Sequence, residues 1–130
     1  MKDTIIIVAI ILVIVLCDIV TKNYLNKTVY ELLTSLETLK EKVIEAKQTN
    51  EREEIKKEME IVEQKWENTS KICSIIVVHQ EIDNIEQALT RGKSSINYGI
   101  LEDALQEIET AIFFSEHVKE REKLSLKNIF

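Results

Sequence analysis

Apolar residues recur at alternating intervals of four and three positions over residues 25–46. This spacing keeps one face of an α-helix apolar for about six turns and is the heptad pattern of helices that pack side by side. The positions are Leu25, Val29, Leu32, Leu36, Leu39, Val43 and Ala46. The same spacing returns at Ile55, Met59, Val62, Trp66, Thr69, Cys73 and Ile76. The chain is therefore predicted to fold as packed helices.

Composition supports an all-α fold. The 130 residues include no proline and only 2 glycines, while 31% of them are charged. Proline and glycine are the residues that interrupt helices, so their scarcity favours long ones. A formal net charge of −6 argues against nucleic-acid binding, and 2 cysteines are too few for a disulfide framework or a four-thiolate zinc site.

The amino-terminal region carries an apolar run at residues 5–17, which resumes at Ile19 and Val20 after Asp18. With its flanking threonines it covers about 18 residues, the lower limit for a helix that crosses a hydrocarbon layer roughly 30 Å thick. We expect residues 1–24 to form a membrane anchor and juxtamembrane segment, as a single-pass helix that continues into the heptad segment. The expected location is the cell membrane.

A cleaved signal peptide is the alternative interpretation, but no small-residue cleavage pattern follows the apolar run. The sequence indicates less directly on which side of the membrane the helical bundle lies. Lys2 precedes the span and Lys22 and Lys27 follow it, so the positive charges do not by themselves favour export. A short amino-terminal tail is nevertheless easily left in the cytoplasm, and we expect the helical body outside it.

Breaks in the apolar phase predict the turns. Continuing the first stripe would bury Asn50 and Glu53, so the first helix should end at residues 48–50, with Asn50 as N-cap of the second. The stripe that follows Ile76 is displaced by two positions, which predicts a turn between residues 77 and 80. Its members are Val78, Ile82, Ile85, Leu89, Gly92 and Ile96. A stripe through His79 would instead allow one continuous helix.

The third turn is expected at residues 97–99, which read Asn-Tyr-Gly. A fourth helix follows, marked by Leu101, Ala104, Leu105, Ile108, Ala111, Ile112 and Phe114, and we expect it to end near Lys119. The prediction is an antiparallel up-and-down bundle of about four helices over residues 25–119, with an apolar tail at residues 120–130. The lengths return the second turn and the tail to the membrane.

Two histidines are expected at one level of this bundle. Reflecting the third and fourth helices about Tyr98 places His79 opposite His117, with Glu81, Asp83 and Glu116 nearby. Imidazole and carboxylate groups are ligands that Zn²⁺ accepts. No short HxxxH or HExxH spacing presents two ligands on one face, however, so histidines that flank helix ends are the preferred interpretation. No metal or cofactor is predicted, and no motif of an enzyme is present.

The tail carries four large apolar side chains within seven residues: Leu124, Leu126, Ile129 and Phe130. Beside a membrane they could dock onto the bundle, lie in the lipid interface or contact a membrane partner. Docking onto the bundle is the simplest interpretation, and contact with a partner is the functional one.

Several short motifs occur in a recognisable order: Trp66 in a helical hairpin, HQEIDNIE at residues 79–86 followed by Arg91, EHV at residues 116–118 and KLSLKNIF at residues 123–130. Their order resembles the small membrane-anchored bacterial family described as domain of unknown function 4363. The resemblance implies an anchored helical architecture without an assigned activity. It also marks His79, Asp83, Arg91 and His117 as motif positions. Gly92 and Lys119 stand where that pattern is expected to carry a large apolar residue and a proline.

These observations favour a non-enzymatic, membrane-anchored interaction protein, either an accessory or scaffold subunit of another membrane protein or a homo-oligomer. The heptads at residues 25–46 permit self-association. The alternative is a domain that senses a small ligand or a divalent metal, with its site at His79, Asp83, Arg91, Glu116 and His117.

Overall fold

The computed structural model describes residues 1–76 and 79–129, and the side chains of all of these except 76 and 122–129. Four helices make up the chain: α1 (Lys2–Thr49), α2 (Glu53–Ile76), α3 (His79–Tyr98) and α4 (Leu101–Ile129). No strand occurs among the described residues. The predicted all-α architecture of about four helices is confirmed.

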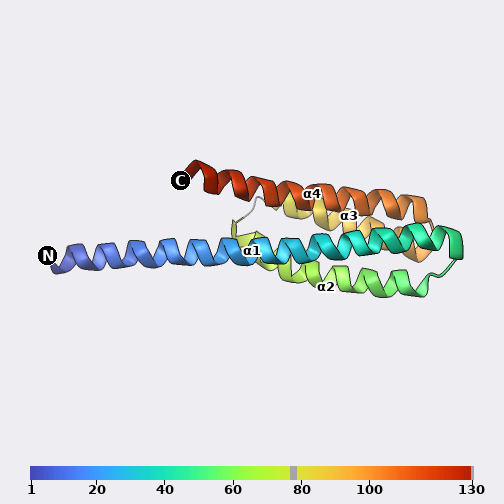
Figure 1. The fold of residues 1–130 in the computed structure, drawn as a ribbon, viewed down its shortest axis with the longest axis horizontal. Coiled ribbons are helices and arrows are strands. Elements are labelled where there is room, and N and C mark those ends of the chain that lie inside the picture. The colour runs from blue at the N-terminus through green and yellow to red at the C-terminus, as the bar shows by residue number, and fades with distance from the viewer. Residues whose placement is uncertain (77–78, 130) are drawn as a thin grey trace.

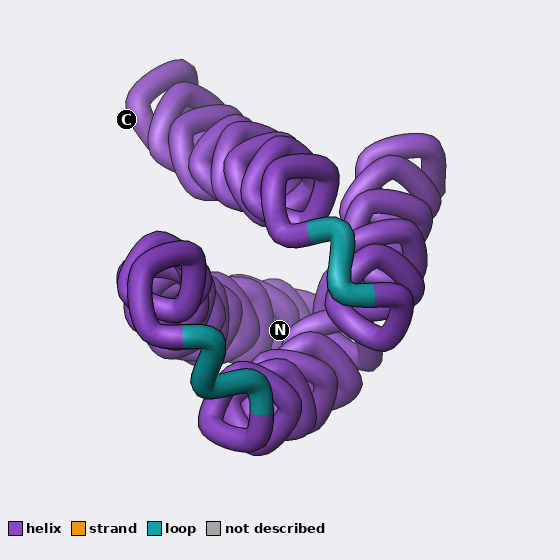
Figure 2. The backbone as a smooth tube through the Cα atoms, turned by 90° about the vertical axis from the view of Figure 1, so that its right-hand side faces the viewer, coloured by secondary structure: helices purple, strands orange, loops and turns teal. Residues whose placement is uncertain are grey.

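The four helices are arranged in a closed ring, in which each helix packs beside the next one in the chain (Figure 2). Contacts join α1 to α2, α2 to α3, α3 to α4 and α4 back to α1. The turns that follow α1 and α3 lie together at one end of the bundle. At the opposite end α1 extends well beyond the other helices (Figure 1), so the end of α2 and the start of α3 lie beside the middle of α1.

The predicted apolar stripes form the core. All seven positions of the first stripe are at most 2% exposed, and the described positions of the second are at most 8% exposed. α3 and α4 complete the core with Ile85, Ala88, Leu89, Ile96, Ala104, Ile108, Ala111, Ile112 and Val118. The heptads at residues 25–46 are therefore covered by the chain's own helices, and a second copy could use them only by displacing those helices.

The first turn differs from the prediction in the role of Asn50. This residue is left-handed, with φ 60° and ψ 15°, and its N–H donates to the Ala46 carbonyl, so it ends α1. α2 begins at Glu53, after Arg52, whose carbonyl accepts from the N–H of Lys56. The prediction of Asn50 as N-cap is wrong because asparagine suits a positive φ as well as an N-cap, and it takes the first role in this turn.

The turn predicted at residues 97–99 is confirmed, with its centre at Gly99. The N–H groups of Gly99 and Ile100 donate to the carbonyls of Ile96 and Ser95, at 3.1 and 2.9 Å. This is the Schellman arrangement, whose left-handed residue favours glycine, and Gly99 has φ 74°. The chain therefore reverses about Gly99, one residue later than the predicted centre.

α4 is longer than predicted. It runs without interruption to Ile129, so the end expected near Lys119 is wrong. Residues 120–129 contain neither proline nor glycine and are rich in residues that favour helices. Because position 119 holds a lysine and not a proline, nothing stops α4 there.

α4 runs antiparallel to α1 in a constant register. Three side-chain contacts define it: Lys47 with Glu102, Lys40 with Glu109, and Lys119 over the ring of Tyr30. The same register brings the backbone of Ile129 level with Val20. Figure 1 shows the end of α4 reaching past the start of α3 toward the amino-terminal part of α1.

The first part of α1 projects from the bundle. Every residue from 1 to 20 is exposed, and the large apolar side chains at residues 5–20 are 39–68% exposed. Burial begins at Lys22, whose ammonium lies 3.1 Å from the carboxylate of Asp18. An 18-residue window of this helix has a mean hydropathy of 3.1 and none of it is buried, so it is a candidate membrane span by length and composition.

Candidate functional site

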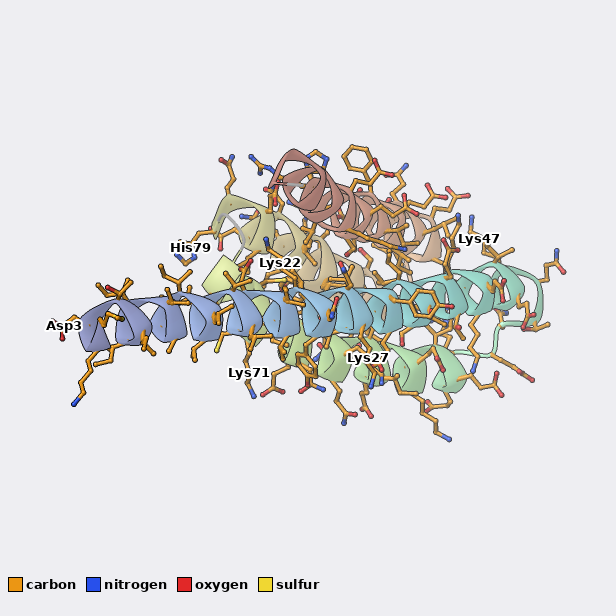
Figure 3. All side chains as sticks on the ribbon, turned by 60° about the vertical axis from the view of Figure 1, so that its left-hand side comes forward. Asp3, Lys22, Lys27, Lys47, Lys71 and His79 are labelled. Carbon is orange, nitrogen blue, oxygen red and sulfur yellow. The ribbon has the colours of Figure 1, made fainter. Side chains whose placement is uncertain are left out.

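The predicted polar site lies at the start of α3 and the second half of α4, at the end of the bundle from which α1 projects. His79 is the first residue of α3 and is exposed. In Figure 3 its side chain extends from this end of the bundle. The residue at the centre of the cluster is not His79 but Glu81, which is 8% exposed.

Two basic side chains of α4 face the Glu81 carboxylate. The Arg121 guanidinium donates a hydrogen bond of 2.6 Å to Glu81 Oε1, and Nε2 of His117 lies 3.5 Å from the same oxygen. The other oxygen, Oε2, is buried and makes no hydrogen bond among the described residues. The cluster is thus a charge-assisted contact that ties α3 to α4, with one acceptor left unused.

The predicted pairing of His79 with His117 is wrong. Because the chain reverses about Gly99 and not Tyr98, the partner of a given α4 residue moves by two positions along α3. His117 consequently faces Glu81. The Arg91 side chain, which lies 3.1 Å from Glu107, follows the same shifted register.

The remaining predicted residues are dispersed. Asp83 and Glu116 are exposed. Arg91 lies twelve positions beyond His79 on α3, about 18 Å along the helix axis, and pairs with Glu107. The structure therefore brings together Glu81, His117 and Arg121, and it does not gather His79, Asp83, Arg91, Glu116 and His117 at one point.

The charges of this cluster bear on the metal alternative. The guanidinium of Arg121 occupies the position beside Glu81 that a cation would need, so a metal ion would have to displace it. Among the described residues no group of three His, Cys, Asp or Glu side chains could hold a metal ion. The arrangement suits a structural ion pair between two helices.

Arg121 was not among the predicted site residues, and Glu81 was expected only near the two histidines, although the sequence holds a signal for the role of both. Glu81 lies four residues before Ile85, on the buried face of α3, and a carboxylate on such a face requires a partner. Arg121 lies four residues after His117 and therefore on the same face of α4.

A second surface that the sequence did not single out lies on the outer face of α4. Phe113 is 63% exposed and stacks on His117, with ring centroids 6.5 Å apart and 14° between the planes. Phe114 meets Phe113 edge to face at 5.5 Å. Consecutive helical residues diverge by about 100°, so two adjacent phenylalanines cannot both face the core. An open depression of about 430 Å³ beside them is lined by Gln106, Glu109, Thr110, Phe113 and Phe114.

The third surface is the projecting part of α1 itself, whose apolar side chains stand on all sides of the helix (Figure 3), from Asp3 to the level of Lys22. The side chains of Leu124, Leu126, Ile129 and Phe130, predicted as partner or membrane contacts, lie outside the described residues. The backbone of α4 places the first three of these positions on the last turns of the helix that returns toward this part of α1.

Comparison with known proteins bears on the resemblance. A family model described as "Domain of unknown function (DUF4363)" matches residues 19–129. No curated protein and no solved structure matches the chain. The matched range takes in the whole bundle and leaves out residues 1–18, the larger part of the apolar segment of α1. Because the match covers most of the sequence, the chain belongs to the DUF4363 family of domains of unknown function.

Proposed function

We propose that this protein is a non-enzymatic, membrane-anchored interaction protein. In this proposal residues 4–21 cross the cell membrane once as part of α1. The bundle then acts as an accessory or scaffold subunit of another membrane protein or assembles with further copies of the chain.

The observation that carries the proposal is the apolar surface at residues 5–20. Its large side chains are 39–68% exposed along one uninterrupted helix. Soluble monomeric proteins rarely expose a contiguous apolar patch of more than a few hundred Å². Lipid covers such a surface without any change in the bundle, because the helix satisfies its own backbone hydrogen bonds.

The bundle offers two surfaces for a partner. The outer face of α4 presents Phe113, an exposed aromatic side chain of the kind enriched at interfaces. The last turns of α4 approach the level of Val20, which supports a contact with lipid or a membrane partner through Leu124, Leu126, Ile129 and Phe130. Contact with a partner through these four residues is part of the proposal.

The proposed sidedness places the bundle outside the cytoplasm. Protease added to intact cells is expected to digest the bundle. Digestion only after the cells are permeabilised would place it in the cytoplasm.

Membrane anchoring is tested by alkaline carbonate extraction of membranes that carry the full chain. The wild type should stay with the membrane pellet, and a variant that lacks residues 5–20 should move to the supernatant. Release of the intact wild-type chain, or a mature product that begins after Cys17, would contradict the proposal.

Partner contact is tested by chemical crosslinking in the same membranes, comparing the full chain with a variant that ends at residue 123. The full chain should crosslink to a distinct membrane protein or to itself through a contact that the shortened chain lacks. An unchanged set of crosslinked products would remove the carboxyl-terminal residues from the proposal.

A further inference from the structure

The projecting part of α1 carries a second heptad stripe that the bundle does not use. Its positions are separated by four and three residues in alternation and are Ile6, Ile10, Val13, Cys17, Val20 and Tyr24. All six are exposed, and the five apart from Cys17 are 53–65% exposed. We call this set the outer stripe. Its spacing is the one by which two helices pack in a left-handed coil.

The outer stripe faces away from the bundle. The core stripe of α1, traced back from Leu25 by the same spacing, passes through Lys22, Asp18 and Val15. Val13 and Val15 are two residues apart, so at 100° per residue they point about 160° away from each other. A helix lying along the outer stripe therefore meets no other helix of the bundle, whereas one lying along Val15 would run toward the end of α4.

A groove on this face has the shape of a coiled-coil hole. It measures about 320 Å³ and is lined by Ile6, Ala9, Ile10, Val13 and Ile14. The first four stand at positions i, i+3, i+4 and i+7, which is the set of four residues that receives one side chain of a facing helix. The small side chain of Ala9 opens the hole, as small residues do where membrane helices approach closely.

We propose that the occupant of this groove is Ile10 of a second copy of the chain, in a parallel pair of α1 helices within the membrane. Ile10 belongs to the outer stripe and borders the hole, so two copies in register place each Ile10 in the hole of the other. Two single-pass copies inserted alike have matching spans and depths. This inference rests on the proposed membrane anchoring and names a partner for it.

The outer stripe carries no charged residue that would oppose the pairing of identical helices. A parallel pair brings each residue of the stripe near its own copy, so a charged residue in the stripe would oppose pairing. The outer stripe holds no charge between Ile6 and Tyr24, while the carboxylate of Asp18 lies on the other face and is paired with Lys22 at 3.1 Å. Continuing the stripe reaches Lys27, Glu31 and Thr34, which are polar and exposed or half-exposed, so the two helices separate where the bundles begin.

The test is disulfide crosslinking of the full chain in native membranes with a copper–phenanthroline oxidant. Cys17 lies in the outer stripe, and Cys73 is buried in the core. The wild type should give a covalent dimer of twice the chain mass, and Cys17→Ala should abolish it. A matched pair in the Cys17→Ala background places one cysteine at Val13 and another at Val15. These valines lie at nearly the same depth and are 59% and 45% exposed.

Val13→Cys should crosslink several-fold more than Val15→Cys, and adding Ala9→Leu, which fills the hole, should lower the yield from Val13→Cys. Equal yields from the two cysteines would overturn the inference, as would no dimer from either in chains that resist carbonate extraction. In both cases membrane anchoring itself stands. Release of the chain by carbonate is the separate result that would reject the proposed function.

Discussion

At the scale of single residues, the carboxylate of Glu81, and not a pair of histidines, joins α3 to α4 at the end of the bundle. Glu81 is nearly buried, and Arg121 supplies its closest cation. A buried carboxylate without a partner is costly, whereas ion pairs in solvent contribute little. The bundle end beside the apolar part of α1 is therefore held by an ion pair between α3 and α4.

Removing the guanidinium tests this role. Arg121→Gln should lower the free energy of unfolding by about 1 to 3 kcal/mol because it leaves the carboxylate of Glu81 poorly compensated. The matched control is Lys71→Gln, since Lys71 pairs with Glu67 at 3.5 Å and both side chains are 70% exposed. The control should change stability by less than about 0.5 kcal/mol. Equal losses in thermal melts of the full chain in detergent would contradict the assignment.

The two glycines give opposite predictions for the same substitution. A Cβ at Gly92, in the interior of α3, would lie 3.5 Å from Cβ of Glu107, an ordinary contact, so Gly92→Ala should raise stability by up to about 1 kcal/mol. At Gly99 φ is 74° and a Cβ would lie 2.6 Å from the Arg52 guanidinium, so Gly99→Ala should lower it by about 1 to 2 kcal/mol. Circular dichroism melts measure both, and shifts of the same sign would contradict the backbone geometry.

At the scale of the helices, apolar phase decides which face is buried. The heptads of α1 and α2 predicted their buried faces position by position, because a side chain on a helix faces either the neighbouring helices or solvent.

The difference in stability contribution between the buried and the exposed face can be tested within α1. Leu36 is 0% exposed and Ile44 is 43% exposed. Leu36→Ala should cost about 2 to 5 kcal/mol and Ile44→Ala less than about 1 kcal/mol in chemical denaturation. Comparable losses would contradict the packing.

The contact between α2 and α3 includes an ion pair with a defined pH dependence. The ammonium of Lys93 lies 2.8 Å from Glu63, and this hydrogen bond and the carboxylate charge raise the pKa of Lys93 above its usual 10.5. A raised pKa in the folded state stabilises the fold at pH values below 10.5, and this stabilisation is lost as the pH rises through the folded value.

The melting temperature of Lys93→Gln should accordingly lie below that of the wild type at pH 8, and the gap should close as the pH rises through the raised pKa of Lys93. The exposed lysine Lys57 on α2 provides the control, since Lys57→Gln should show a smaller gap at pH 8. A gap for Lys93→Gln that persists unchanged at high pH would mean that the ion pair does not cause it.

Helix ends were less predictable than helix faces. The sequence placed the first and third turns within a few residues, and the second falls on residues 77 and 78, which lie outside the described part of the chain. Asn50 serves equally well before or after a break, and only the surrounding chain decides between the two. Moving the last reversal from Tyr98 to Gly99 changed every pairing between α3 and α4, which is why His117 faces Glu81. The end of α4 was misplaced because no residue near Lys119 stops a helix, so the change from charged to apolar residues does not mark an end.

At the scale of the whole molecule, one helix of 48 residues, about 72 Å long, joins an apolar segment to the bundle without a break. Its two halves carry different stripes: the core stripe packs within the chain, and the outer stripe is exposed on the projecting half. A continuous helix transmits orientation, so pairing of two spans would fix how the two bundles stand relative to each other.

The most direct measurement of this arrangement is site-directed spin labelling of α1 in the full chain, reconstituted into lipid vesicles. Labels at residues 6–16 should be protected from a water-soluble nickel complex, and those outside the outer stripe should be accessible to oxygen. Labels at the exposed positions beyond residue 24 should show the reverse, while labels at the buried core positions should be protected from both reagents. The accessibility should keep a helical period through residues 17–30. Water-exposed labels at residues 6–16, or a loss of that period at residues 20–25, would contradict a single helix that leaves the lipid and enters the bundle.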